Sequence, residues 1–266
     1  MTFVLSKNRS QENRRRKGRR MSAAHEKIAL LRAVLAKPGP PEIRVPLGHV
    51  GADSCLGGGL KKAALHEVFA AVSHEAAASG FTAALAARVG GPLIWIRQDY
   101  AALEHGELAA TGLTELGLDP ARVLLLRVPD VAGALRAAAD ALTCAALGTV
   151  VIEIVGAPKL LDLVAHRRLA LGAAEHGVTA LLLRFGAEPD IGVAETRWCV
   201  RGQPSGDGEN WGRPVFAASL ARNRRGPVGE WVMEWSCDDG EFRPADLGAV
   251  VSAPADRPAQ AAMAAA

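Results

Sequence analysis

The sequence predicts an α/β domain built on a doubly wound, mostly parallel sheet. Short, almost wholly apolar segments alternate along the chain with segments whose apolar residues follow helical spacing. Strands with this composition are typical of a parallel sheet, because helices cover both of its faces. Beyond Gly192 the helical segments stop and only strand-like segments follow, which predicts an antiparallel C-terminal hairpin region.

A separate helix is predicted ahead of this domain. Ser22 can cap a helix over residues 23–36, and the prolines from Pro38 onward end it. Its apolar face holds Ile28, Leu31 and Leu35.

The core elements follow in order. The Gly-rich stretch 48–59, which contains LGGGL, is predicted to be a turn or loop, because consecutive glycines favour neither helix nor strand. An apolar run covers residues 64–70. Spacing then predicts helices at 76–89, 131–147 and 160–175, and strands at 92–97, 123–128, 149–155 and 178–185.

Three strands are predicted after Gly192, at 195–201, 214–221 and 229–237. In the last of them, alternation puts one set of side chains on a common face. That face, which either packs in the core or forms an exposed aromatic patch for a partner, holds Trp231, Met233, Trp235 and Cys237.

Charge is distributed unevenly between the tail and the rest of the chain. Residues 1–20 contain eight Lys and Arg and one acid, Glu12, so their net charge is +7. Because the whole chain has a net charge of +3, the remaining residues sum to −4. The basic tail therefore gives no reason to expect nucleic-acid binding by the domain itself. It is a phosphate-binding arm, a disordered N-terminus, or an upstream extension of a protein that starts at Met21.

This pattern divides the chain into four parts. Residues 1–21 are the basic tail, 22–49 the helix with a Pro-rich linker, 50–245 the core and 246–266 an Ala- and Pro-rich tail expected to be frayed.

Several classes of protein are excluded. No apolar segment approaches the roughly 20 residues of a membrane helix, and no targeting signal is present, so we expect a cytoplasmic protein. The histidines lack metal spacing and a neighbouring nucleophile pattern. The cysteines, expected to be free thiols because they lie tens of residues apart, are Cys55, Cys144, Cys199 and Cys237.

Four segments in register resemble the landmarks of RecA-like proteins. They are LGGGLKKAALHEVF (56–69), EAAASGFT (75–82), TVVIEI (149–154) and LARNRRGPVGEW (220–231). The first and last are most similar to the ImuA group, RecA/SulA-like proteins of bacterial inducible-mutagenesis cassettes. The resemblance covers residues 50–243 and implies a RecA-like core.

The phosphate loop of that family departs from its pattern here. In G-x-x-x-x-G-K-[ST], backbone N–H groups and a Lys hold the phosphates. Matching Gly80 and Thr82 to the last Gly and the hydroxyl puts Phe81 at the Lys position and Glu75 at the first Gly. A carboxylate about 4 Å from a phosphate would cost about 4 kcal/mol. Alternatively, the segment is simply the start of a helix.

The other catalytic positions are altered as well. Glu153 stands where the resemblance implies a Walker-B Asp, and Gln98 falls near a water-activating Glu, although a neutral amide cannot accept a proton from water. We therefore expect no cofactor and no catalysis. A divergent DNA-dependent ATPase that recruits Lys61 or Lys62 is the alternative.

The segment ARNRRGP carries concentrated positive charge. Its resemblance to the basic finger of RecA-like oligomers points to Arg222, Arg224 and Arg225. These arginines would contact an acidic partner surface, a nucleic-acid backbone or acids of this chain, or else remain solvated.

The altered catalytic positions predict a non-catalytic assembly factor, and the resemblance implies that it acts in DNA-damage-induced (SOS) mutagenesis and translesion synthesis. Implied partners are a Y-family-polymerase-like protein and an error-prone replicative-type polymerase, with RecA, a second copy of the chain, or DNA as further contacts. By the same analogy, helix 23–36 would dock on a neighbouring RecA-like subunit. A SulA-like inhibitor of cell division is a third hypothesis.

Overall fold

A computed structural model describes residues 42–190, 192–205 and 213–245 of the chain. A compact unit begins at Ile43, upstream of residue 50, where the core was predicted to start. Both predicted tails and the predicted helix 23–36 lie outside the described residues. The candidate residues that fall there are Ile28, Leu31 and Leu35.

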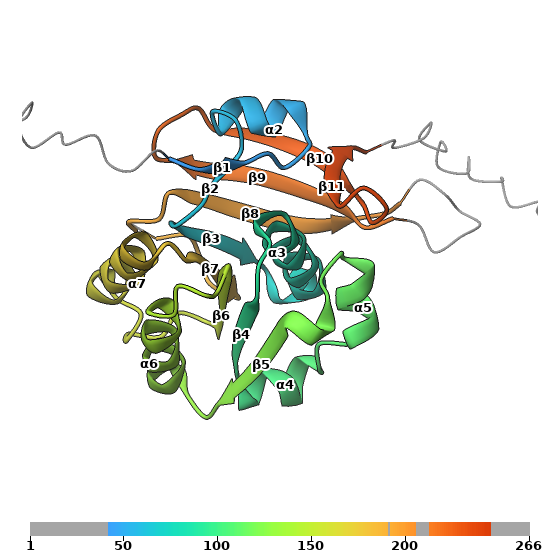
Figure 1. Cartoon of the computed structure of the whole chain (residues 1–266). Helices are drawn as coiled ribbons and strands as arrows, with labels where there is room; N and C mark the ends of the chain where they lie inside the picture. Colours follow the sequence, from blue (N-terminus) through green and yellow to red (C-terminus); the bar gives the residue numbers. More distant parts are fainter. Residues whose placement is uncertain (1–41, 191, 206–212, 246–266) are drawn as a thin grey trace, which may run out of the picture. The chain divides into compact units, whose positions relative to one another are not determined.

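One nine-stranded sheet organises the fold (Figure 1). The six strands from β8 to β5 are parallel, and β9, β10 and β11 continue the sheet antiparallel. From one edge to the other the strands are β11 (Glu241–Pro244), β10 (Gly229–Ser236), β9 (Val215–Asn223), β8 (Thr196–Gln203), β3 (Leu65–Ala70), β7 (Thr179–Phe185), β6 (Thr149–Val155), β4 (Leu93–Gln98) and β5 (Val123–Val128).

The predicted fold class is confirmed. The three strands after Gly192 were predicted to form an antiparallel hairpin region, and β9 pairs antiparallel with both β8 and β10. On its other side β8 pairs parallel with β3, so β8 joins the hairpin region to the parallel strands.

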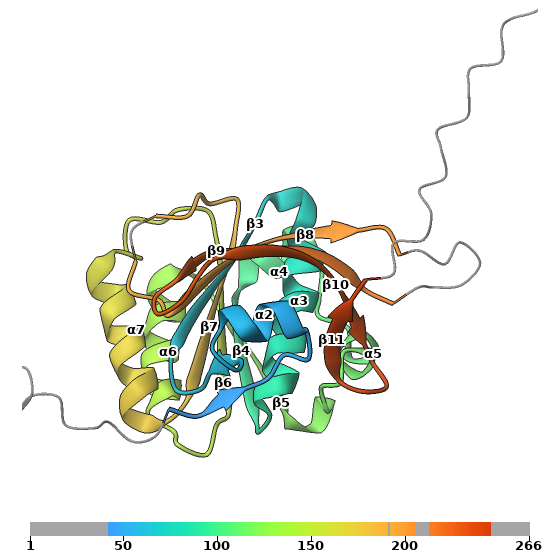
Figure 2. The ribbon, with the colours of Figure 1, turned by 90° about the horizontal axis from the view of Figure 1, so that it is seen from above.

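Helices cover both faces of the parallel strands (Figure 2). On one face lies α3 (Glu75–Val89), and on the other lie α6 (Val131–Leu142) and α7 (Leu163–His176). Successive side chains of β6 therefore pack on opposite faces of the sheet. Val151 belongs to the hydrophobic cluster that includes α3, and Ile152 to the cluster that includes α6 and α7. None of the helices in the described ranges is long and apolar enough to cross a membrane.

Two helix boundaries differ from prediction, and local hydrogen bonds explain both. Helix α6 ends at Leu142 rather than residue 147, because the N–H groups of Thr143 and Cys144 donate to carbonyls three residues earlier, at 3.1 and 3.0 Å, and tighten the last turn. Helix α7 starts at Leu163 rather than residue 160, because the Asp162 carboxylate caps it and accepts from the Ala165 N–H at 2.8 Å.

The Gly-rich stretch 48–59 is only partly the loop that was predicted. It contains a short helix, α2 (Val50–Cys55), capped by His49, whose Nδ1 accepts from the Ala52 N–H. The glycines of LGGGL then turn the chain with positive φ, as expected.

Short elements without a periodic signature were not predicted. They are β1 (Arg44–Val45) and β2 (Leu60–Lys61), which pair with each other, α4 (Asp99–His105), α5 (Ala110–Glu115), β11, and two 3-10 turns, η1 (Val72–His74) and η2 (Pro120–Arg122).

Candidate functional site at the carboxyl ends of the parallel strands

The candidate site lies where β4 and β6 end beside the start of α3. In open α/β sheets this edge is where ligands bind. A cavity of about 330 Å³ opens here between α3 and residues 106–116. Its charged lining includes Glu75, Arg97 and Glu153, while Ala, Gly and Leu residues make much of the rest.

Glu75 is the first residue of α3, and Gly80, Phe81 and Thr82 lie inside that helix. The interpretation of 75–82 as the start of a helix is therefore confirmed. Within a helix, backbone N–H groups beyond the first turn donate to carbonyls four residues earlier. Those of residues 80–82 are consequently not arranged as a phosphate loop.

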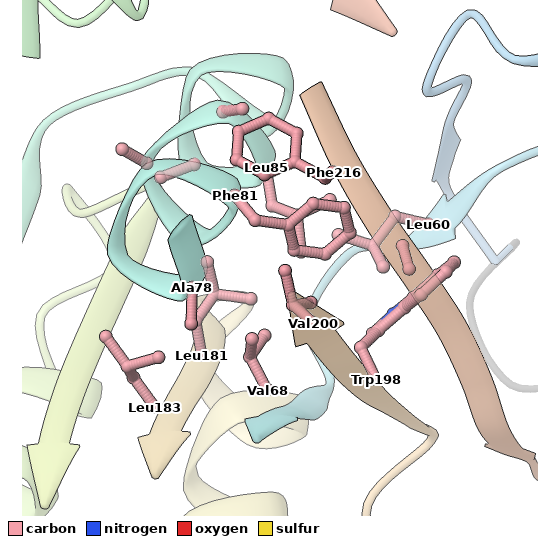
Figure 3. Close-up of a cluster of buried hydrophobic side chains, with 14 of the residues drawn as sticks. Leu60, Val68, Ala78, Phe81, Leu85, Leu181, Leu183, Trp198, Val200 and Phe216 are labelled. Carbon is pink, nitrogen blue, oxygen red and sulfur yellow. The ribbon is translucent and has the colours of Figure 1, made fainter. Parts of the chain in front are cut away.

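Phe81 is fully buried in an aromatic cluster (Figure 3). Its ring centroid lies 5.2 Å from that of Phe242, 5.5 Å from Trp198 and 5.7 Å from Phe216. Next to it, the Thr82 hydroxyl donates to the Ala78 carbonyl at 2.7 Å and is also buried. Both side chains are buried, and neither lines the cavity.

Glu153, in β6, is held by two side chains of β4. Its Oε2 accepts from Trp95 Nε1 at 2.8 Å, and its Oε1 accepts from Arg97 Nη2 at 3.0 Å and Nε at 3.2 Å. Arg97 also donates to the Gly106 carbonyl at 2.9 Å. Because both side chains are almost fully buried, this is an internal ion pair with directed hydrogen bonds on both carboxylate oxygens.

Gln98 ends β4, and its side chain bridges to the neighbouring strand. The Val155 N–H donates to Gln98 Oε1 at 3.4 Å. The amide thus lies near the site, as the sequence indicated, and contacts backbone.

The lysines considered as replacements lie at the opposite end of α3. Lys62 Nζ donates to the carbonyl of Val89, the last residue of the helix. Fourteen residue steps separate Val89 from Glu75, about 21 Å along the helix. Lys61, in β2, lies next to it at the amino edge of the sheet, where its carbonyl bonds His66.

The basic turn between β9 and β10 is partly neutralised by its own chain. Arg222 Nη1 donates to the Gly192 carbonyl at 2.5 Å, and Arg225 Nε lies 3.5 Å from Glu195 Oε1. Arg224 is exposed and has no ion pair with any described residue. Of the three candidates, Arg224 is thus the most available to a partner.

The tryptophans of β10 differ in accessibility. Trp235 is fully buried, with its ring 4.9 Å from Phe242, so it belongs to the core. Trp231 is half-buried, 6.0 Å from Trp198. Only Trp231 retains surface that a partner could contact.

A second buried charge cluster surrounds Glu67, on the face covered by α7. Its carboxylate accepts from Arg197 Nε at 2.7 Å and lies 3.0 Å from His166 Nε2. The Phe69 ring lies between the guanidinium groups of Arg184 and Arg197, each 5.5 Å from its centroid. An open cavity of about 1050 Å³ adjoins these side chains.

The environment of this cluster shifts two pKa values in opposite directions. Burial would raise the pKa of Glu67, but hydrogen bonds from His166 and Arg197 outweigh it and lower that pKa. Burial would lower the pKa of His166, but its bond to Glu67 raises it. The pair is thereby stabilised as ions.

Sequence reasoning missed Arg97, Glu67, Arg184 and His166. Arg97, Glu67 and Arg184 could have been found from the sequence, because a charged residue inside an otherwise apolar strand requires a buried partner. Which partner it finds depends on strand order, which the pattern does not give. Across the described ranges, no cluster of three His, Cys, Asp or Glu side chains could hold a metal ion.

Comparison with known proteins gives relatives in sequence and in structure. No family model matches the chain. The protein ImuA of Caulobacter vibrioides, in strains NA1000 / CB15N and ATCC 19089 / CIP 103742 / CB 15, is 31% identical over 208 residues, which span 70% of this chain and 81% of the relative. The crystal structure of the RadB recombinase matches with a TM-score of 0.54 and 17% identity, covering 76% of this chain and 100% of that one.

Proposed function

The chain belongs to the ImuA family, and from that premise we propose that it is a non-catalytic RecA-like assembly factor in DNA-damage-induced mutagenesis. It acts in translesion synthesis by binding other proteins rather than by turning over a nucleotide. Its proposed partners are a Y-family-polymerase-like protein and an error-prone replicative-type polymerase, with RecA or a second copy as further candidates. A direct DNA contact would use the exposed Arg224.

The observation that carries this proposal is the Arg97–Glu153 pair. A nucleotide site of this class holds Mg²⁺ with a carboxylate that corresponds to Glu153 of β6. Here both oxygens of Glu153 already accept hydrogen bonds from Arg97 and Trp95. Pulling the guanidinium away would separate a buried ion pair, at a cost of about 3–5 kcal/mol. The arginine therefore takes the place that a metal ion would need.

The described lining of the cavity contains no lysine to bind phosphate, and its one arginine, Arg97, is bound to Glu153. The cavity beside the start of α3 has Glu75 in its lining, and Lys62 is hydrogen-bonded at the far end of the same helix. A phosphate here would meet a carboxylate where it needs an ammonium group. These features support a binding role over an ATPase role.

An unpaired sheet edge supports the protein-contact part of the proposal. Among the described residues, β5 pairs only with β4, and Leu124 on it is 62% exposed. Exposed apolar edge strands are sites at which other chains add. A partner that covers β5 would remove this surface from water.

The test combines calorimetry with affinity purification. Titration of the purified protein with Mg·ATP should give no saturable heat, and purification from DNA-damaged cells should recover polymerase subunits. Saturable ATP binding that is lost in Glu153→Gln but kept in Glu230→Gln, an exposed acid outside the cavity, would overturn the non-catalytic role. Recovery of a cell-division protein in place of polymerases would favour the SulA-like alternative.

The cavity itself is the observation that favours the second candidate, a divergent ATPase. It lies at the edge of the sheet where nucleotides bind in doubly wound folds. The same titration decides between the two.

A further inference from the structure

Helices α6 and α7 lie on the face of the sheet opposite α3 (Figure 2), and residues of both helices line a groove there. Near their carboxyl ends they approach closely, since a Cβ added to Gly172 would lie 3.4 Å from the Leu142 Cβ. Toward their amino ends they leave a groove of about 460 Å³. This volume is within the range of about 300–1,000 Å³ typical of ligand pockets.

The groove has an apolar lining that is accessible to a partner. Leu160 is 59% exposed and Val164 54% exposed, and the half-buried Leu135 lies across from them on α6. Small side chains at Ala132 and Ala139 leave room for another backbone to approach. Clustered apolar exposure of this kind marks interaction surfaces.

Two arginines accompany the apolar residues. Arg136 and Arg168 both line the groove and are exposed. Neither has a hydrogen bond or ion pair with another described side chain. The one acid in the lining, Asp162, caps α7 through the Ala165 N–H. The groove therefore combines apolar contact area with positive charge that its own chain does not neutralise.

We propose that this groove binds an acidic amphipathic helix of a partner protein. Leucine-like side chains of that helix would lie on Leu135, Leu160 and Val164, and its acids would pair with the two arginines. A nucleic acid fits less well, because its phosphates would leave the apolar lining uncovered. The chain's own segment 22–37 has three basic residues and one acid, so its charge is of the wrong sign.

The proposal extends the protein-contact role by naming a surface and its ligand chemistry. It rests on the proposed function only in that the protein acts by binding partners. The experiment below uses synthetic peptides and the full chain, so its failure would leave the ATP titration and the recovery of polymerases unaffected.

The test is fluorescence anisotropy with a labelled helix of about 15 residues. The acidic probe has Leu at positions i, i+3, i+4 and i+7, flanked by Glu. The basic probe has the same leucines, with Lys in place of each Glu. The acidic probe should bind saturably and the basic one should not. The double variant Arg136→Glu/Arg168→Glu should weaken the acidic probe about tenfold, since it replaces two attractions by repulsions, and should gain affinity for the basic probe.

Matched controls lie on the same helix. Arg167→Glu changes an exposed arginine outside the groove, and Leu171→Asp changes a leucine that is 68% exposed outside it. Both should bind as the wild type does, whereas Val164→Asp should not bind. Equal binding of both probes, equal effects of Arg167→Glu and the double variant, or displacement of the acidic probe by a single-stranded oligonucleotide would overturn the proposal.

Discussion

At the scale of single residues, Arg97 and Glu153 are an unusual pair to find in adjacent apolar strands. Each is almost fully buried, and each would be strongly destabilising alone. Together with Trp95 they form a hydrogen-bonded set between β4 and β6. Replacing both residues together should therefore reduce the stability of the fold less than replacing either one alone.

Arg97→Met should lower the free energy of unfolding by about 3–5 kcal/mol, because the buried carboxylate of Glu153 loses the positive charge that compensates it. Adding Glu153→Gln should recover a large part of that loss. Urea unfolding of the two single variants and the double variant measures the coupling.

The matched control is Arg127→Met. Arg127 is the register partner of Arg97 in β5 and pairs with Glu107, but the side chains of Arg127 and Glu107 are both about half exposed. Its loss should be about 1 kcal/mol or less. Similar losses for Arg97→Met and Arg127→Met would contradict the structural importance given to the buried pair.

His66 should make stability fall on acidification. It is fully buried between Thr196, at 2.7 Å from Nδ1, and the Lys61 carbonyl, at 2.8 Å from Nε2, and burial lowers its pKa to about 4. The unfolded chain takes up this proton near pH 6.5 and the folded protein only near pH 4. Stability should therefore be full above pH 6.5 and lose about 3 kcal/mol by pH 4.

Unfolding curves of the wild type and His66→Gln, taken from pH 7 to pH 4, check this expectation. The variant should show a shallower decline over that window. Burial also lowers the pKa of His49, but this residue is present in both proteins, so its effect cancels in the difference. The pKa of Glu67 is lowered, so its contribution to stability is lost only as the pH falls below the usual range of a glutamate. The pKa of His166 is raised, so its contribution is lost as the pH rises above the usual pKa of a histidine. Parallel curves would show that His66 does not govern the acid limb.

At the scale of elements, the strands with apolar sequence were predicted within one or two residues and the helix ends less well. Strand β6 was predicted at residues 149–155 and is found at Thr149–Val155. Helix α7 was predicted to begin at residue 160, where apolar spacing begins, but the Asp162 cap sets its start. Short elements such as α5 depend on contacts with the rest of the chain, so no local sequence pattern predicted them.

Strand β5 shows what position in the sheet adds to a strand's sequence. VLLLRV is as apolar as its neighbours, yet it forms the edge, with Leu124 and Leu125 exposed. Burial on both faces was expected for every such strand. The sequence of a strand does not specify whether it is central or at the edge.

The double variant Leu124→Lys/Leu125→Lys should reduce recovery of partner subunits in affinity purification from damaged cells. The free energy of unfolding should change by only about 0.5 kcal/mol per site, because both side chains are on the surface. Val228→Lys is the control, since Val228 is an exposed apolar residue in the β9–β10 turn. Equal recovery by the double variant and the wild type would remove β5 from the contact surface.

At the scale of the whole molecule, one aromatic cluster connects the parallel and antiparallel parts of the sheet. Phe81 from α3, Trp198 from β8, Phe216 from β9, Trp235 from β10 and Phe242 from β11 are in contact within it. All five are buried. The antiparallel strands are therefore part of the same core as the parallel ones.

Phe242→Ala should consequently destabilise the protein as a whole, by about 3–5 kcal/mol. Tryptophan fluorescence and far-UV circular dichroism should report one coincident transition in the wild type, and both should shift together in the variant. If fluorescence shifted and circular dichroism did not, the C-terminal strands would be a separate unit.

The sequence by itself determined the fold class, the order of strands and helices along the chain, and the family, because hydrophobic periodicity and short motifs are local properties. It also placed Glu153 within strand 149–155. Tertiary structure alone decided that β8 joins the parallel strands, that Phe81 packs against residues more than 100 positions away, and that Arg97 is the cation bound to Glu153. These outcomes depend on which strands become neighbours, and buried charges and rings are satisfied by neighbours in space.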